Sequence, residues 1–100
     1  MYRFSRTVTL RQMAFMPEAI KFAANIVEHL RKEYGWNTSA GSEIYGEPKL
    51  HWFTDFETLE QMAQAQGKMP QDKTYWSLLD SAKHLWVDGS VRDRIVKMLG

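Results

Sequence analysis

The sequence contains no cysteine. Disulfides, thiol nucleophiles, iron–sulfur clusters and thiolate zinc sites are therefore excluded together. Long hydrophobic runs are also lacking. No stretch approaches the ~18 apolar residues that span a bilayer, and residues 1–6 contain no apolar run typical of a signal peptide. We therefore expect a cytoplasmic protein without a membrane partner.

An excess of charge of one sign is absent too. The chain has 13 basic and 12 acidic residues, for a net charge of +1. Nucleic-acid-binding proteins usually carry a strongly basic domain or a basic stripe, so we expect no nucleic-acid partner. The sequence has neither a Gly-rich phosphate loop nor a nucleophile elbow, and His51 and His84 lack the close spacing of a zinc-binding helix. We expect no metal and no cofactor.

The chain does contain enough apolar sequence for one core. Its 100 residues suit a single domain over residues 1–100, and 44% of them are hydrophobic, as in ordinary globular proteins. The four Trp, four Tyr and five Phe residues exceed what a bare core needs. A Trp-rich core is the simplest explanation of this surplus, and the lining of a pocket or an interface is the alternative.

Residues 2–10 alternate between apolar and polar side chains, which is the period of a strand. The apolar face consists of Tyr2, Phe4, Val8 and Leu10, and Arg6 interrupts it. Arg6 is either a charge at the strand end that reaches water or a polar group aimed into a cavity.

A helix is predicted from Pro17, at a position where a missing N–H costs nothing, to Gly35, a typical helix-stop residue. Its apolar stripe consists of Ala19, Ile20, Ala23, Ile26, Val27, Leu30 and Tyr34. His29 and Asn25 fall outside this stripe, so we expect both side chains in solvent.

The next two segments predict a hairpin. Residues 36–46 form a less hydrophobic strand, in which Gly41 suggests a bulge or a close backbone approach. A turn signal then leads into a strand over residues 50–55. Large side chains on both of its faces, Trp52 on one and His51 and Phe53 on the other, indicate a central strand covered on both sides.

Two helices and a strand complete the chain. The Thr and Glu at residues 54 and 57 have the spacing of a capping box, which predicts a helix that follows the strand with almost no loop. A break at residues 67–70 separates this helix from another over residues 71–86. Residues 91–99 alternate as a closing strand.

This order of elements is the split βαβ arrangement of the ferredoxin-like fold, an α+β fold with a four-stranded antiparallel sheet and helices on one face. Right-handed crossovers place the first and third strands at the sheet centre. The strand faces left uncovered still carry Trp, Phe, Tyr or Val. We therefore expect a homodimer that packs through its sheet faces, and an open monomeric sheet is the alternative.

In its element order the chain resembles the dimeric α+β barrel superfamily, which includes antibiotic-biosynthesis-type monooxygenases, stress-responsive barrel proteins and NIPSNAP-like domains. The opening strand, the strand over residues 50–53 that leads into residues 56–61, and the helix that contains residues 75–79 carry the resemblance, which covers nearly the whole chain. It implies a dimeric α+β barrel with a ligand cavity between sheet and helices in each subunit.

Two more specific functions fit the chain poorly. Heme-degrading members of the superfamily use an Asn on the first strand, a Trp on the third and a His late in the last long helix. Trp52 and His84 match, but residues 5–7 contain no Asn, and His84 projects away from the apolar stripe of its helix. The RNA-recognition domain shares the element order, but Leu50 and Trp52 replace both glycines of its signature.

Cofactor-free oxygenases of this architecture place Trp, Tyr, Asn or Arg beside an aromatic substrate. By this resemblance, the residues that could line a pocket are Arg6, Tyr45, Trp52, Phe56, Tyr75, Trp76 and Trp86, with core packing as the alternative for each. His51 is the candidate catalytic residue because a His titrates near neutral pH and can transfer protons. A buried, hydrogen-bonded His is the alternative.

The function that we expect is binding of a small hydrophobic molecule, aromatic or aliphatic, in an apolar pocket between sheet and helices, with or without cofactor-independent monooxygenation. The alternative is a structural or interaction homodimer that binds no ligand. We expect Trp52 to pack toward the helices and keep His51, on the other face of its strand, as the polar candidate.

Overall fold

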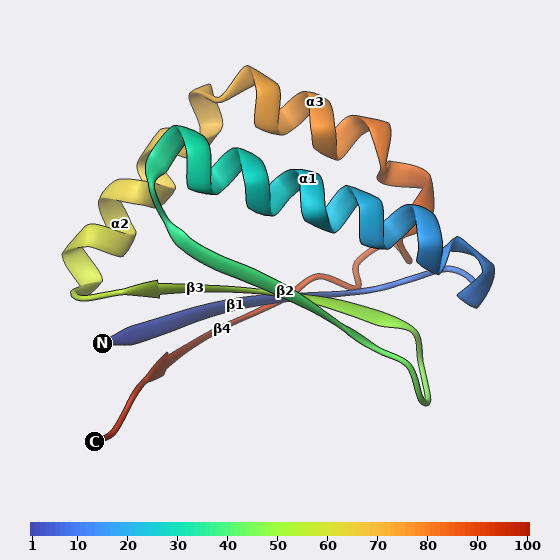
Figure 1. The fold of residues 1–100 in the computed structure, drawn as a ribbon, viewed down its shortest axis with the longest axis horizontal. Helices are drawn as coiled ribbons and strands as arrows, with labels where there is room; N and C mark the ends of the chain where they lie inside the picture. Colours follow the sequence, from blue (N-terminus) through green and yellow to red (C-terminus); the bar gives the residue numbers. More distant parts are fainter.

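A computed structural model describes all 100 residues and contains four strands and three α-helices (Figure 1). In chain order these are β1 (Tyr2–Thr9), α1 (Met16–Tyr34), β2 (Asn37–Glu43), β3 (Lys49–Phe56), α2 (Leu59–Lys68), α3 (Lys73–Ser81) and β4 (Arg92–Lys97). Short 3-10 helices precede α1, join α2 to α3 and follow α3. None of the helices is both long enough and apolar enough to cross a membrane.

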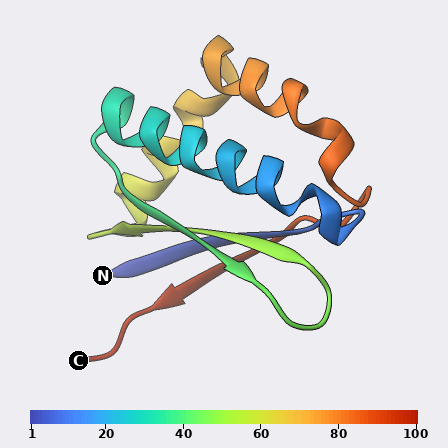
Figure 2. The same cartoon turned by 45° about the vertical axis from the view of Figure 1, so that its right-hand side comes forward.

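The four strands form one antiparallel sheet in the order β2-β3-β1-β4. The predicted ferredoxin-like fold is confirmed, with β1 and β3 at the sheet centre. All three α-helices lie on one face of the sheet, and the other face is open (Figures 1 and 2). Successive side chains of a strand point to opposite faces. The burial of Val8 and Leu50 shows that the even-numbered residues of β1 and β3 face the helices.

α1 begins and ends close to the predicted bounds, and most of the predicted stripe faces the sheet. Pro17 lies in its first turn, and Gly35 caps its C-terminus in the left-handed region with φ of 66°. The buried residues are Met16, Ala19, Phe22, Ala23, Ile26 and Leu30. The predicted stripe is wrong in including Ile20, which is 50% exposed, because Phe22 occupies the buried side of the helix instead.

α2 begins later than the pattern at residues 54–57 predicts. Strand β3 extends through this pattern, and Thr54 is buried in the sheet, where its hydroxyl lies 3.0 Å from that of Thr38. The N-cap of α2 is Thr58, whose Oγ1 accepts a hydrogen bond from the Gln61 N–H. Pairing with β1 and β2 keeps the segment before the cap extended, so the sheet determines where the helix starts.

The helix predicted over residues 71–86 ends earlier, at the end of α3. A 3-10 turn over Lys83–Leu85 replaces its last part. Trp86 then pairs with Leu10 in an isolated β-bridge beyond the end of β1. Backbone hydrogen bonds to the end of β1 thus replace helical hydrogen bonds in this segment.

Gly41 does not form the predicted bulge. β2 and β3 pair without interruption over residues 37–43, with Gly41 opposite His51. Nothing lies within 4 Å of the place where a Cβ on Gly41 would be. β2 is therefore a regular strand at the edge of the sheet.

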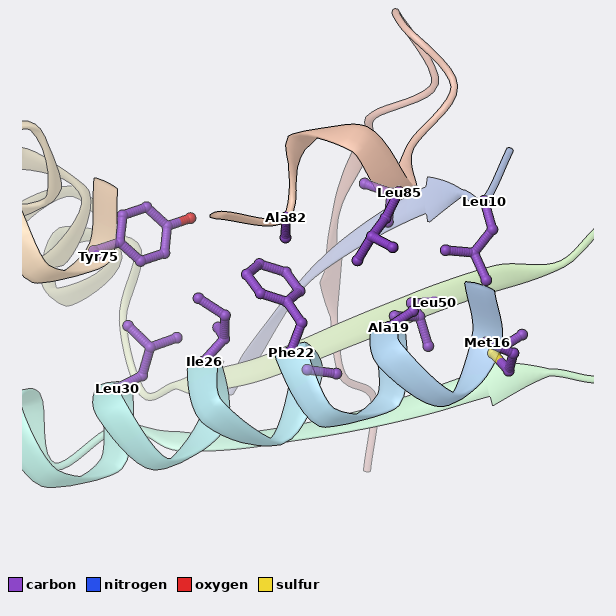
Figure 3. Close-up of a cluster of buried hydrophobic side chains, with 12 residues drawn as sticks. Leu10, Met16, Ala19, Phe22, Ile26, Leu30, Leu50, Tyr75, Ala82 and Leu85 are labelled. Carbon is purple, nitrogen blue, oxygen red and sulfur yellow. The ribbon is translucent and has the colours of Figure 1, made fainter. Parts of the chain in front are cut away.

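The core lies between the helices and the central strands (Figure 3). Side chains that are 2% exposed or less come from several parts of the chain, with Leu10 after β1, Ala19 on α1, Leu50 on β3 and Leu85 after α3. Burial of one such Leu contributes about 1.5–3 kcal/mol. This cluster holds α1 on the sheet and fixes the segment that follows α3.

Candidate functional site

A cavity of about 700 Å³ lies between the sheet, α1 and α3, which is within the usual size range of small-molecule sites. Most of its lining is apolar. Among the predicted pocket residues, those that line it are Arg6, Trp52, Phe56, Tyr75, Trp76 and Trp86. They come from β1, β3, α3 and the segment after α3, so the fold brings together residues from both ends of the chain.

Two of the predicted site residues lie elsewhere. Tyr45 is 87% exposed in the turn between β2 and β3. His51 points to the open face of the sheet because it neighbours Trp52 on β3, and neighbouring side chains of a strand point to opposite faces. Trp52 therefore faces the cavity and His51 does not.

Three aromatic rings form one wall of the cavity. Phe22 on α1 packs edge-on against Trp52, with ring centroids 6.0 Å apart, and its centroid lies 5.4 Å from that of Trp86. The rings of Trp52 and Trp86 are 6.2 Å apart at an angle of 79°. The Nε1 of Trp52 is buried and has no hydrogen-bond partner, although a buried unpaired donor is costly.

The polar end of the cavity is built around Arg6. Its Nε and Nη2 donate to the two carboxylate oxygens of Asp93 on β4, both at 2.8 Å. Its Nη1 lies 3.5 Å from the hydroxyl oxygen of Tyr75, and its guanidinium carbon lies 5.7 Å from the ring centroid of Phe4. This two-point ion pair neutralises the charge of Arg6 and gives each oxygen of Asp93 a partner.

Tyr75 supplies the second polar group at this end, and only 9% of it is exposed. Burial raises the pKa of its hydroxyl above the ordinary value, and the charge of Arg6 opposes that shift. The hydroxyl is therefore protonated at neutral pH. Because Arg6 donates to its oxygen, the hydroxyl proton of Tyr75 remains available for an acceptor.

The candidate catalytic residue His51 belongs to a chain of hydrogen bonds on the open face. Its Nδ1 lies 2.7 Å from Oγ1 of Thr7 on β1, and its Nε2 lies 2.7 Å from Oε1 of Glu43 on β2. Its ring stacks on that of Phe53, with centroids 6.0 Å apart and planes 9° apart. This arrangement can hold a proton between a hydroxyl and a carboxylate, but it lies outside the cavity.

The open face is mostly polar, which differs from the Trp, Phe, Tyr or Val expected there. Arg3 and Asp55 form an ion pair with bonds of 2.8 and 3.1 Å, which lowers the pKa of Asp55. The guanidinium of Arg3 lies 6.0 Å from the ring centroid of Phe53. Strand alternation places Phe53 and Val96 on this face and turns Trp52 to the helices.

A buried cluster between α1 and α3 was not predicted from the sequence. One carboxylate oxygen of Asp72, the N-cap of α3, lies 2.7 Å from His29 Nε2 and 2.5 Å from the Tyr34 hydroxyl. The other oxygen accepts the Tyr75 N–H at 2.9 Å. The prediction that His29 lies in solvent is wrong, since α3 packs beside it and leaves its side chain 11% exposed. The available signal was an Asp at a helix N-cap position shortly after Pro70.

The cluster shifts two pKa values. Burial alone would raise the pKa of Asp72, but hydrogen bonds from Tyr34, His29 and the Tyr75 N–H outweigh it and lower the pKa to about 2. Burial, the hydrogen bond to Asp72 and nearby negative charge raise the pKa of Tyr34 to about 12. Asp72 is therefore ionised and Tyr34 protonated throughout the neutral range.

The remaining His points away from the core, as predicted. His84 is half exposed, and its Nε2 lies 2.9 Å from Oε1 of Glu18 on α1. No group of three or more His, Asp or Glu side chains is placed to hold a metal ion.

Solved structures of two kinds share this fold. An uncharacterized NIPSNAP domain protein from Burkholderia xenovorans superposes with a TM-score of 0.80 at 10% identity, over 99% of this chain and 95% of that one. A NIPSNAP family protein with unknown function from Agrobacterium tumefaciens superposes with a TM-score of 0.79 at 18% identity, over 98% of this chain and 87% of that one. A putative antibiotic biosynthesis monooxygenase from Deinococcus radiodurans superposes with a TM-score of 0.72 at 13% identity, over 100% of this chain and 94% of that one.

These structures define the class. The chain has the α+β ferredoxin-like fold of the NIPSNAP and antibiotic-biosynthesis-monooxygenase-like proteins, so the resemblance drawn from the element order is confirmed at the level of the fold. No protein-family model matches the sequence, and no curated protein matches it. Because a fold hosts many functions, the function has to be argued from the cavity itself.

Proposed function

We propose that the cavity binds a small, uncharged aromatic molecule that carries a hydrogen-bond acceptor. The observation that carries this proposal is the distribution of polar groups along the cavity. At the polar end Tyr75 has a free hydroxyl proton, whereas Arg6 already bonds to both oxygens of Asp93. The free group at this end of the cavity is a donor, so the matching ligand brings an acceptor such as a carbonyl oxygen.

The aromatic character of the ligand follows from the wall beside this polar end, since Trp52 pairs with Arg6 across β3 and β1. Phe22, Trp52 and Trp86 meet edge to face or at an angle, with centroids 5.4 to 6.2 Å apart. Aromatic rings favour such packing with a further ring, by about 0.5–1.5 kcal/mol beyond area burial. A volume of about 700 Å³ accommodates two or three fused rings.

The absence of net charge on the ligand follows from the Arg6–Asp93 pair. A carboxylate ligand would compete with Asp93 for the guanidinium, and separating a partly buried ion pair leaves an uncompensated charge. A cationic ligand would be repelled by Arg6, or would have to displace Arg6 from Asp93. A neutral ligand leaves the pair intact and only needs to reach the proton of Tyr75.

Binding is better supported than proton-transfer catalysis in the cavity. The pKa of Tyr75 is raised by burial, which makes its hydroxyl a poor base at neutral pH. The candidate base His51 lies on the other face of the sheet. Among the similar structures, the putative monooxygenase makes oxygenation the activity to test, by oxygen uptake, on any ligand that binds.

Isothermal titration calorimetry with 9-fluorenone, fluorene and fluorene-9-carboxylate tests the proposal. The three probes share one ring system and differ in an acceptor and a charge. We expect fluorenone to bind about fivefold more tightly than fluorene, as one net hydrogen bond of about 1 kcal/mol predicts, and the carboxylate to bind most weakly. Tyr75→Phe should reduce fluorenone affinity to that of fluorene. The exposed Tyr45→Phe is the matched control and should change nothing.

The outcomes separate the candidate functions. Equal affinities of fluorenone and fluorene would remove the acceptor from the proposal, and tightest binding of the carboxylate would overturn the argument from charge. No binding of any probe would instead favour a structural homodimer without a ligand.

We also propose a homodimer that packs through the open sheet faces. Phe53 and Val96 supply apolar area there, and the polar groups are already paired in ways that a covering sheet need not disturb, as in Arg3 with Asp55. Sedimentation velocity tests this: Phe53→Lys should lower the dimer fraction, because it places a charge between the sheets. Unchanged sedimentation of this variant would rule out this interface.

A further inference from the structure

The outer edge of β2 has no partner within the chain. β2 is the end strand of the sheet, and no further segment runs beside it (Figure 2). It carries neither Pro nor Lys nor a bulge, which are the usual features that protect an edge strand from pairing. The other edge strand, β4, has Arg92, Arg94 and Lys97, so two copies of it would bring like charges together.

The hydrogen bonds of Thr38 reveal which groups of β2 face outward. Its N–H donates to Trp36 O at 3.0 Å, and its O accepts from Arg31 Nε at 2.9 Å, so neither group serves the ladder to β3. In an antiparallel ladder, alternate residues turn both backbone groups to the same side. Ala40 and Ser42 therefore also present N–H and C=O to the outer edge, and neither is bonded there.

A groove of about 770 Å³ runs beside this edge, between β2 and α1, with Glu28, Arg31 and Lys32 among its lining residues. Ile20, Ala24 and Val27 line it from the helix, and Ala40 lines it from the strand. Ile20 is the residue of the predicted apolar stripe that the core leaves half exposed. The groove and the free backbone groups lie on the same side of the molecule.

We propose that β2 pairs antiparallel with β2 of a second copy of this chain, about a two-fold axis at Gly41. In this register Ala40 of one copy lies opposite Ser42 of the other, and their free backbone groups bond reciprocally. An axis at Ala40 would instead place Ser42 opposite Thr38, whose groups are occupied. The axis at Gly41 puts the single charge of β2, Glu43, opposite the uncharged Ser39 of the partner, so no like charges meet between the two strands.

A second copy suits this surface better than an unrelated peptide because the edge is self-complementary. Reciprocal bonding of Ala40 and Ser42 satisfies every outward group between them. The same axis brings the two copies of α1 toward each other over the groove, so that Ile20 and Val27 lose contact with water. The surface is distinct from the open sheet face, because edge pairing extends the sheet and leaves its face free.

Cysteine cross-linking tests the register. The chain has no cysteine, and a Cβ on Gly41 would meet no atom within 4 Å, so Gly41→Cys adds one unstrained thiol. Opposed residues of a non-hydrogen-bonded pair have Cα atoms about 4.5 Å apart, within the range that a disulfide spans. Under mild oxidation Gly41→Cys should form a covalent dimer that reducing agent reverses. Ser39→Cys on the same strand, whose two copies lie far apart in this register, should remain a monomer.

A second comparison separates this edge from the open sheet face, toward which position 41 also points. In the Gly41→Cys background, Ile20→Lys should lower the rate of cross-linking about tenfold, since it places a charge in the groove at a cost of roughly 1.4 kcal/mol or more. Ile95→Lys is the matched control, because Ile95 on β4 is equally exposed at 51%, and it should leave the rate unchanged. Equal cross-linking of Gly41→Cys and Ser39→Cys, or an unchanged rate with Ile20→Lys, would overturn the proposal.

Discussion

Replacement of Asp72 by Asn tests whether the buried cluster between α1 and α3 stabilises the fold through charge. The substitution keeps the shape of the side chain and an oxygen that can still accept the Tyr75 N–H at the start of α3. It removes the carboxylate that both His29 and Tyr34 contact. We therefore expect Asp72→Asn to fold, with a lower free energy of unfolding.

The size of this loss follows from the pKa of Asp72. The ordinary value is 3.8, and the value in the fold is about 2. At neutral pH this difference corresponds to about 2 kcal/mol of stability. Because the pKa is lower in the folded state, the stabilisation is fully present above pH ~4 and is lost as pH falls through 2. For a domain of this size, about 2 kcal/mol lowers Tm by roughly 10 °C.

Urea unfolding followed by circular dichroism, repeated between pH 7 and pH 2, measures both the loss and its pH dependence. Wild type and Asp72→Asn should differ by about 2 kcal/mol at pH 7 and converge toward pH 2. Asp80→Asn is the control, because Asp80 is 73% exposed beside Lys83, and its loss should stay within about 0.5 kcal/mol. An equal stability of wild type and Asp72→Asn at pH 7, or a difference that does not shrink in acid, would refute the reasoning.

Three further predictions concern the core and the alkaline limit. The pKa of Tyr34 is raised to about 12, so the stability it contributes is present below pH 10 and lost as pH rises toward 12; Tyr34→Phe should flatten this alkaline loss in urea unfolding. Leu85→Ala should cost about 2–5 kcal/mol because the side chain is fully buried, whereas Leu59→Ala, at a half-exposed site, should cost far less in the same assay. Thr38→Val should lower Tm by leaving the Thr54 hydroxyl unpaired in the core, and adding Thr54→Val should recover part of the loss.

The fold could be predicted from the sequence because its signals are local and repeated. The alternation in residues 2–10, the bounds of α1 from Pro17 to Gly35, and the order of the elements were each sufficient for their part. The start of α2 was not predictable in this way. Thr54 has the residue type of a helix cap, but pairing on both sides of β3 and the bond to Thr38 keep it in the sheet.

The site was predictable in composition but not in arrangement. The resemblance indicated all the predicted lining residues except Tyr45 correctly, and Arg6 stood out because it interrupts an apolar strand face. Its partner Asp93 carries no pattern of its own, since the two meet only when β4 pairs with β1. The cluster of His29 and Asp72 likewise depends on how two helices dock, which helical periodicity does not describe.

The alternation along β3 has a consequence for how this chain can change. Trp52 lines the cavity under the helices, while His51 and Phe53 on either side of it belong to the opposite surface. A substitution at one of these positions therefore alters one surface and leaves the other in place. If the proposed ligand and sheet-face dimer hold, the fit to the one and the contact with the other can thus diverge independently, through changes at adjacent codons.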